Sequence, residues 1–362
     1  MKKISKKLMI IMAVLLALTV LVGCSPKAPA AEQSAPAAAA EESSGGSDAA
    51  PAAQKLVFGY VAPSADTWYQ RSIDGFTWGA EQDGHEVWAF YSDYDVEKEL
   101  AASDSLVQEN VAGICYLPMN ESGPVACAKK AAEKNIPVVV TDGCGAAMGQ
   151  GVDIAVSVDF DWYGMGVTYA HWMADNYPGE NFYIMTGTLE SVPCQRVNAG
   201  MLEEAAKLGK NENVGLQPYA YQANDAVNVA QDLLVSGLDF SLLFVMDETA
   251  GVAVIRMLDE KGALNNPIKV FCQNGNPIGL PLMKNGDMSF TISSSPGWAG
   301  LICYYAMRDF IEGNAAANKQ IMLPVMPITM DNIDDPMKVV PWDLTPDVFL
   351  ALTKEYFPEY VR

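Results

Sequence analysis

Apolar runs and segments with helical periodicity alternate along the chain from residue 55 onward. The apolar runs, rich in β-branched and aromatic residues, are predicted strands at 55–61, 85–92, 113–118, 136–143, 182–188, 216–222, 240–248, 268–275 and 289–295. The segments between them predict helices at 69–83, 95–110, 124–135, 195–208, 224–235 and 249–261. Strands that alternate with helices of roughly 10–15 residues indicate βαβ units and a mainly parallel sheet.

The predicted strands are apolar nearly throughout, which is typical of strands whose two faces are both covered by helices. Nine such strands exceed what one small sheet holds, and the chain from residue 55 is long enough for two domains. We therefore expect an α/β fold made of two doubly wound, Rossmann-like lobes.

The N-terminus has a different pattern. Four lysines in residues 2–7 precede an apolar run at 8–22, which is the length of a signal-peptide core and short for a membrane span. The string LVGC that ends at Cys24 resembles the bacterial lipobox, in which the cysteine receives a lipid and becomes the first mature residue. This predicts a lipoprotein signal peptide at 1–23. The alternative is an ordinary signal peptide with a chance cysteine.

Residues 24–54 contain almost only Ala, Pro, Ser, Gly and Glu after the cysteine, so they cannot bury enough apolar surface to fold and are predicted to be a disordered linker. The chain has 23 basic and 44 acidic residues; without the four lysines of 1–23, 19 basic residues remain and the net charge is −25. Such a charge excludes nucleic acid as a partner and disfavours anionic lipid surfaces. Membrane attachment is thus expected only through the lipid, on the outer face of the cell membrane.

Polar or aromatic side chains follow most of the predicted strands. In doubly wound sheets ligands bind beyond the carboxyl ends of the strands, so these positions are candidates for a binding cleft. Any one of them could instead cap a helix or face solvent in a loop; the whole series favours a cleft. The candidate ligand-binding residues are Asp66, Trp68, Tyr69, Asn120, Asp142, Arg196, Asp247, Asn274 and Ser294.

Three strings of the sequence, one of which contains Asp142, resemble segments of one family. Asp74–Gly75 in the first helix, IPVVVTDG at 136–143 and SVDFDWYG at 157–164 are similar to segments of type I periplasmic binding proteins of the ribose/galactose group, which deliver small molecules to ABC importers. The resemblance implies two lobes joined by a three-segment hinge. It places the N-terminal lobe at 55–158 plus about 295–325, and the C-terminal lobe at 159–294 plus about 326–362.

The resemblance also implies roles for the candidate residues. Trp68 and Tyr69 stand where the family places aromatic rings against a sugar, Asp142 where a carboxylate accepts hydrogen bonds from hydroxyls, and Arg196 where a second-lobe arginine contacts ligand. Asn274 replaces a sugar-binding carboxylate and Ser294 replaces a glutamine. These departures make the ligand shell less acidic than in ribose-type proteins.

These features predict a monomeric solute-binding lipoprotein that captures a sugar or sugar-like compound for an ABC permease, with no cofactor and no metal. A ligand-sensing receptor and a nucleoside-binding protein remain alternatives on the same fold. An enzyme is not expected, because the chain has two histidines, His85 and His171, and no recognisable catalytic motif. The cysteines form no C-x-x-C pair. Cys115, Cys272 and Cys303 are expected to be buried thiols, whereas Cys144 and Cys194 flank candidate site residues.

Overall fold

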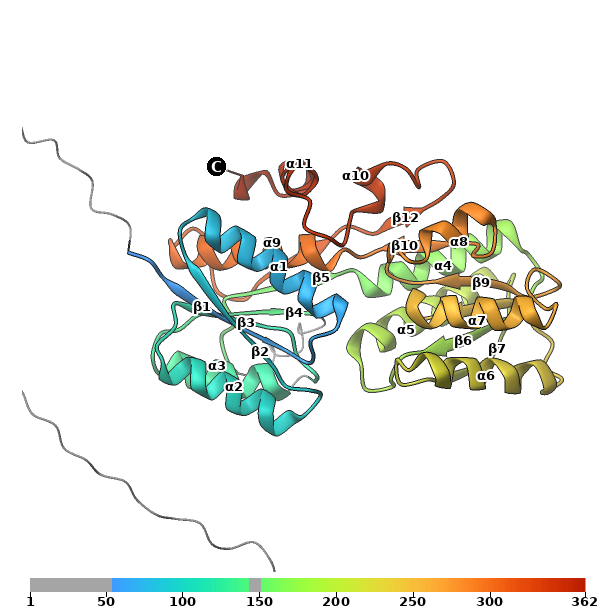
Figure 1. Ribbon diagram of the computed structural model, residues 1–362, viewed down its shortest axis with the longest axis horizontal. Helices are drawn as coiled ribbons and strands as arrows, with labels where there is room; N and C mark the ends of the chain where they lie inside the picture. The colour runs from blue at the N-terminus through green and yellow to red at the C-terminus, as the bar shows by residue number, and fades with distance from the viewer. Residues whose placement is uncertain (1–53, 121, 143–150, 362) are drawn as a thin grey trace, which may run out of the picture. The chain divides into compact units, whose positions relative to one another are not determined.

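The computed structural model describes residues 54–120, 122–142 and 151–361 of the 362-residue chain. In this part of the chain most strands form two parallel sheets covered by helices (Figure 1), as the sequence predicts. The larger sheet has six strands in the order β11-β5-β4-β3-β1-β2. They are β1 (Val57–Ala62), β2 (Glu86–Tyr91), β3 (Gly113–Tyr116), β4 (Val138–Thr141), β5 (Val156–Phe160) and β11 (Lys319–Leu323).

The six-stranded sheet is the centre of the N-terminal lobe. Because successive side chains of a strand point to opposite faces, Phe58 and Tyr60 of β1 belong to one hydrophobic cluster and Val61 to another. Helices α1 (Thr67–Gln82) and α9 (Pro296–Ile311) pack together on the first face, and α2 (Val96–Gln108) and α3 (Ser122–Ala132) on the second (Figure 1). Burial on both faces explains the continuous apolar strings of the strands.

The C-terminal lobe contains a four-stranded parallel sheet in the order β7-β6-β8-β9. Its strands are β6 (Phe182–Thr186), β7 (Asn213–Pro218), β8 (Leu242–Val245) and β9 (Lys269–Cys272). Its helices are α4 (Trp162–Asn176), α5 (Val192–Leu208), α6 (Ala223–Val235), α7 (Glu248–Glu260) and the short α8 (Leu280–Asn285). Most predicted elements are confirmed within a few residues. The prediction for β7 is displaced: the strand ends at Pro218, so the aromatic residues of 216–222 follow it.

The chain passes between the lobes at three places: from β5 to α4, from β10 (Thr291–Ser293) to α9, and from β11 to β12 (Met326–Ile328), which pairs antiparallel with β10. The last part of the chain divides its contacts. After α10 (Pro336–Val339), which contacts β12, helix α11 (Pro346–Tyr356) and the 3-10 helix η2 (Pro358–Tyr360) pack on α9 of the N-terminal lobe. The lobe boundaries expected from the sequence remain a prediction.

Glycine lets α1 and α9 approach very closely. A Cβ atom on Gly75 of α1 would lie 1.9 Å from the carbonyl oxygen of Gly297, and a Cβ on Gly300 of α9 would lie 1.8 Å from that of Ser72. Neither contact leaves room for a methyl group, and backbone atoms cannot move aside as the end of a side chain can. The pairing of these two helices, far apart in sequence, therefore requires glycine at both positions.

No helix among the described residues is both long enough and apolar enough to cross a membrane. The predicted signal peptide, Cys24 and nearly all of the linker lie outside the described residues, as does Cys144.

We predict that Gly300→Ala destabilises the protein by about 2–4 kcal/mol, because the added methyl forces α1 and α9 apart. Urea denaturation followed by circular dichroism measures the loss. The control is Ala101→Ser, an added heavy atom on the exposed face of α2, which should change stability by no more than about 0.5 kcal/mol. Equal, small effects of the two substitutions would contradict the close packing of α1 and α9.

Candidate functional site

Left-handed backbone conformations gather in the loops that follow the carboxyl ends of the strands. Asp142 after β4 has φ +64°, Tyr94 after β2 has +59°, Tyr221 after β7 has +55° and Asn274 after β9 has +101°. Non-glycine residues seldom adopt such angles, and when they do the surrounding structure must hold them there. Four of the positive φ angles in the described chain thus fall at strand ends where the sequence predicts a binding cleft.

In the N-terminal lobe, three predicted residues and one unpredicted residue lie together. The Tyr94 hydroxyl donates to the Asp66 carboxylate at 2.9 Å, and the rings of Tyr94 and Tyr69 meet edge to face with centroids 6.4 Å apart. Burial raises the pKa of Tyr69 well above its ordinary value, and the charges of Tyr94, Asp66 and Asp142 raise it further. Asp142 is therefore near enough to Tyr69 for their charges to interact.

Asp142 carries an unsatisfied acceptor. Its Oδ1 atom is buried and has no hydrogen-bond partner among the described residues. Burial disfavours the charged carboxylate and raises the pKa of Asp142 to about 7. A buried oxygen without a partner is costly, and a ligand hydroxyl that donates to it would remove that cost.

The C-terminal lobe contributes a second aromatic group. Tyr219 and Tyr221 follow β7, with ring centroids 6.1 Å apart, and the Tyr219 hydroxyl donates a short hydrogen bond to Asp247. The Tyr221 hydroxyl lies 3.0 Å from the Sγ atom of buried Cys194. Burial raises the pKa of Tyr221 well above its ordinary value, and the charge of Tyr69 from the other lobe is among the smaller causes. Tyr69 and Tyr221 thus face the same region from the two lobes.

Asn274, Ser294 and Trp68 are connected through a tryptophan that the sequence did not single out. Ser294 Oγ donates to Asn274 Oδ1 at 2.9 Å, and Trp342 Nε1 donates to the Asn274 carbonyl oxygen at 3.1 Å. The indole ring of Trp342 meets that of Trp68 edge to face, with centroids 5.2 Å apart. Trp68 also lies near Phe160, at 6.3 Å between centroids.

Glu248, the first residue of α7, is hydrogen-bonded to the turn that contains Asn274. Its Oε1 atom accepts hydrogen bonds from Gly275 N at 2.7 Å and from Thr291 Oγ1 at 2.6 Å, while its Oε2 atom is buried without a hydrogen-bond partner among the described residues. The residue is 1% exposed, and this burial raises the pKa of Glu248 to about 8. At neutral pH Glu248 is therefore mainly the uncharged acid.

Of the remaining predicted residues, two cap helices and one is exposed to solvent. Asn120 Oδ1 accepts from the Ser122 backbone N at 3.0 Å and so caps α3. Asp247 Oδ1 accepts from Ala250 N at 2.9 Å and caps α7, in addition to binding Tyr219. Arg196 is exposed on α5 and makes no ion pair with a described residue. The structure thus brings together Asp66 and Tyr69 around Tyr94, with Asp142 near Tyr69. It also brings together Trp68 and Asn274 around Trp342, with Ser294 bonded to Asn274.

Sequence reasoning missed Tyr94, Tyr219, Tyr221 and Trp342. The first three follow the carboxyl ends of β2 and β7, and the rule applied to the other strands would have found them. Trp342 has no such signal, because it lies in an irregular segment between α10 and α11.

The described cysteines are buried, and each of the two histidines has a polar contact with a neighbouring residue. The free cysteines among the described residues, Cys115, Cys127, Cys194, Cys272 and Cys303, are all buried, which agrees with the expectation for three of them. His85 Nδ1 accepts from the Leu56 backbone N at 3.4 Å, and His171 Nε2 lies 3.2 Å from a Glu204 carboxylate oxygen on the surface.

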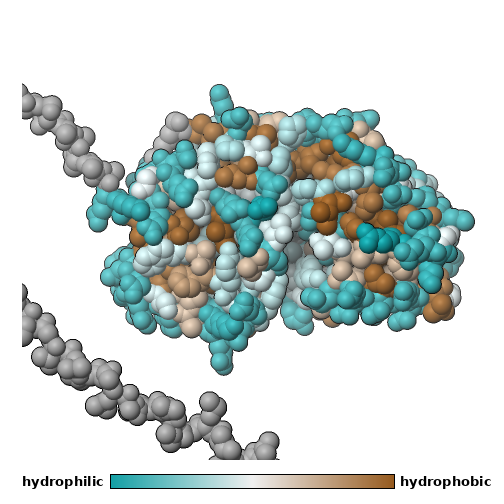
Figure 2. All heavy atoms as spheres, in the orientation of Figure 1, coloured by the Kyte–Doolittle hydropathy of each residue, from teal (hydrophilic) through white to brown (hydrophobic). Residues whose placement is uncertain are grey.

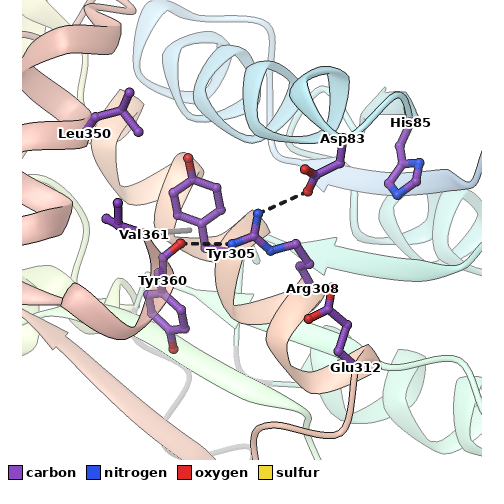
Figure 3. Close-up of a pocket in the computed structure, with 8 residues that line it drawn as sticks. All are labelled: Asp83, His85, Tyr305, Arg308, Glu312, Leu350, Tyr360 and Val361. Atoms are coloured by element: carbon purple, nitrogen blue, oxygen red, sulfur yellow. Dashed lines mark hydrogen bonds and ion pairs between the residues drawn. The ribbon is translucent and has the colours of Figure 1, made fainter. Parts of the chain in front are cut away.

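Figure 2 shows a furrow between the two lobes on the face that it draws. Two cavities lie away from the candidate residues. One, of about 400 Å³, is lined by the end of α1, by α9 and by the C-terminal segment; Figure 3 shows Arg308 in it, paired with Asp83 and with the Tyr360 carbonyl. The other, of about 530 Å³, lies between β6, the end of α5 and the start of β7. Neither includes a residue of the predicted site.

Comparisons with known proteins identify similar folds. Residues 58–315 match the sequence model of the periplasmic binding protein domain. An ABC transporter solute-binding protein from Burkholderia graminis in complex with D-arabinose has a TM-score of 0.72 and 20% identity, over 78% of this chain and 98% of that chain. One from Bacillus halodurans with bound myo-inositol has a TM-score of 0.72 and 17% identity, over 78% and 96%. A third, from Actinobacillus succinogenes with bound D-allose, has a TM-score of 0.71 and 16% identity, over 78% of this chain and 100% of that chain.

At these identities the solved structures establish the fold alone. No curated protein sequence matches the chain significantly.

We predict that Glu248→Gln gains stability relative to the wild type as the pH rises. Above about pH 4.5 Glu248 ionises in the unfolded chain, but in the folded chain it holds its proton until about pH 8, so the wild type loses stability across this window. Glutamine has no such loss, and its amide oxygen can accept the same two hydrogen bonds. Urea unfolding at pH 5, 6.5 and 8 measures the difference.

The control is Glu133→Gln, an exposed residue on the α3 side of the same fold, whose stability difference should be independent of pH. A Glu248→Gln difference that also stays constant from pH 5 to pH 8 would contradict a buried, protonated Glu248.

Proposed function

The chain belongs to the periplasmic binding protein family, and from this we propose that it captures a small polyhydroxylated ligand, a sugar or sugar-like compound, between its two lobes and delivers it to an ABC importer. The family consists of solute-binding proteins that act outside the cytoplasm. The solved relatives described above carry D-arabinose, myo-inositol and D-allose, each a compact ring with several hydroxyl groups. This supports the same class of ligand here.

One observation supports the proposal: aromatic side chains lie at strand ends in both lobes, and one strand end also carries a buried carboxylate oxygen that has no partner among the described residues. Tyr69 and Trp68 come from α1, Tyr221 follows β7, and Asp142 supplies the free oxygen. A sugar has apolar C–H faces and a rim of hydroxyl donors, so aromatic faces and a carboxylate are the complementary groups. The proposed binding residues remain those predicted from the sequence, with Asn120 and Arg196 the least supported by their surroundings.

Transport requires that ligand binding change the orientation of one lobe relative to the other. The three chain crossings form the proposed hinge, and a ligand that contacts both lobes favours a closed form that a permease can recognise. We further propose that Cys24 carries a lipid and that the protein acts as a monomer on the outer face of the membrane. The basic and apolar N-terminus that ends in LVGC supports this attachment.

A thermal-shift screen tests the proposal. We expect at least one of D-arabinose, myo-inositol, D-allose and related sugars to raise the melting temperature, because a ligand that binds only the folded state stabilises it by mass action. Nucleosides form a second arm, since aromatic rings also stack on bases. Stabilisation by nucleosides alone would replace the sugar proposal, and stabilisation by neither class would contradict it.

We predict that Asp142→Asn and Trp68→Ala each weaken binding of the sugar found in that screen at least about tenfold. A charge-assisted hydrogen bond and an aromatic contact are each worth more than ~1.4 kcal/mol when removed from a buried site. Isothermal titration calorimetry measures the change, with Asp175→Asn on the exposed surface of α4 as the control. Unchanged affinity in either site variant would remove that residue from the site.

The Asp142 carboxylate also predicts a pH dependence. Its pKa is about 7 in the ligand-free protein, so below pH 7 the acceptor is increasingly protonated. Ligand that binds the ionised form should bind more tightly as the pH rises from 6 to 8, and Asp142→Asn should abolish this trend. Titrations at pH 6, 7 and 8 measure it; a wild-type affinity that falls over this range would contradict the assigned role.

A further inference from the structure

A segment beyond the family-matched region reaches back to the candidate site. We call residues 339–343 the C-terminal strap; the match to the family ends at residue 315. Ser293 Oγ donates a short hydrogen bond to the Val339 carbonyl, and Ser295 Oγ donates to the Pro341 carbonyl at 2.6 Å. Both serines lie where the chain crosses from β10 to α9, so the strap is fixed to one of the three crossings between the lobes.

The strap also contacts both lobes beyond this crossing. Asp343 Oδ1 lies 2.5 Å from Arg71 Nε of α1 in the N-terminal lobe. A Cβ atom on Gly297 of α9 would lie 2.5 Å from the Trp342 carbonyl oxygen, so α9 and the strap are in close backbone contact. On the other side, the Trp342 indole N–H donates to the Asn274 carbonyl of the C-terminal lobe at 3.1 Å.

Trp342 is the centre of these contacts. It is 4% exposed, and its ring meets Trp68 at a centroid distance of 5.2 Å and an interplanar angle of 79°. The carbonyl that it binds belongs to Asn274, whose φ of +101° is unusual for a residue other than glycine. One indole therefore restrains an aromatic ring from one lobe and a strained turn from the other.

The strap itself is held in a strained conformation. Val340 has φ +51° and ψ +97°, although a β-branched side chain makes positive φ particularly unfavourable. Such a residue persists only where its neighbours determine its conformation, and strained residues of this kind cluster at functional sites. The hydrogen bonds at Val339 and Pro341, on either side of Val340, supply that restraint.

We propose that Trp342 is a positioning residue of the ligand site, which fixes the ring of Trp68 and the Asn274 turn relative to each other across the two lobes. The proposal rests on the proposed function, because Trp68 and Asn274 are taken to be ligand contacts. Trp342 itself need not touch the ligand. Its removal lowers affinity by letting these two contacts move independently.

Two measurements on the full chain without ligand test the positioning. Trp342→Phe keeps a ring against Trp68 and removes the indole N–H, so amide exchange at residues 274–276 should speed up about fivefold, the factor expected for one lost hydrogen bond. Two indoles at this distance also couple in far-ultraviolet circular dichroism. That coupled band should be lost in both Trp342→Phe and Trp68→Phe.

The matched control is Trp172→Phe in the C-terminal lobe, where Trp172 stacks on Phe290 at 4.8 Å. It should keep the coupled band and leave exchange at 274–276 unchanged. If exchange in Trp342→Phe rises equally at 274–276 and in β6, Trp342 only stabilises the fold, and the proposal is overturned. An unchanged band and unchanged exchange would overturn it as well.

A third measurement connects the positioning to binding. Trp342→Phe should weaken binding of D-arabinose, myo-inositol or D-allose about fivefold or more, whichever of them the wild type binds. If the wild type binds none, the proposed function fails for these sugars, while exchange and circular dichroism still decide whether Trp342 positions Trp68 and Asn274. Should Trp342→Phe not fold, Asp343→Asn replaces it, because the Asp343 side chain is 70% exposed and its loss releases only the Arg71 end of the strap. A smaller increase in exchange at 274–276 is then expected, and no increase would overturn the proposal.

Discussion

Burial of both faces of two parallel sheets determines where the other features of this protein can lie. Residues such as Tyr60 and Val61 alternate between helix-covered faces, so the central strands of the sheets have no polar surface of their own. Polar chemistry is therefore confined to the loops at the strand ends. Because all strands of each sheet run parallel, the carboxyl ends of a sheet share one edge, and residues distant in sequence such as Asp66 and Tyr94 meet there.

The same constraint explains how much of the fold could be predicted from the sequence. Apolar runs and helix periodicity located every strand of the two parallel sheets except β5 and β11, and they located helices such as α2. Asp95 caps α2, with its Oδ1 atom accepting from Glu97 N at 2.8 Å. The contact of α1 with α9 could not be predicted by these means. It depends on the close approach at Gly75 and Gly300, which lie far apart in sequence, and periodicity contains no information on such pairs.

Part of the candidate site could also be predicted from the sequence and part could not. Residues that follow strands, such as Asp142 and Asn274, could be proposed from the sequence because topology alone brings strand ends together. Their chemical states were not predicted: the raised pKa of Asp142 and the protonation of Glu248 result from burial, which depends on the packed neighbours. Trp342 was missed because its position is determined by the irregular strap and by hydrogen bonds to Ser293 and Ser295, not by any repeating pattern.

The buried cysteines have a consequence for how this protein matures. Its family works outside the cytoplasm, where conditions favour disulfide formation, yet the five described free thiols are all enclosed by the native core. Cys194 contacts the hydroxyl of Tyr221, and Cys272 packs closely against Gly251 of α7. The folded protein shields these sulfurs, but a newly exported chain exposes all of them at once. Oxidation can therefore reach these sulfurs before the chain has folded, and rapid folding protects them.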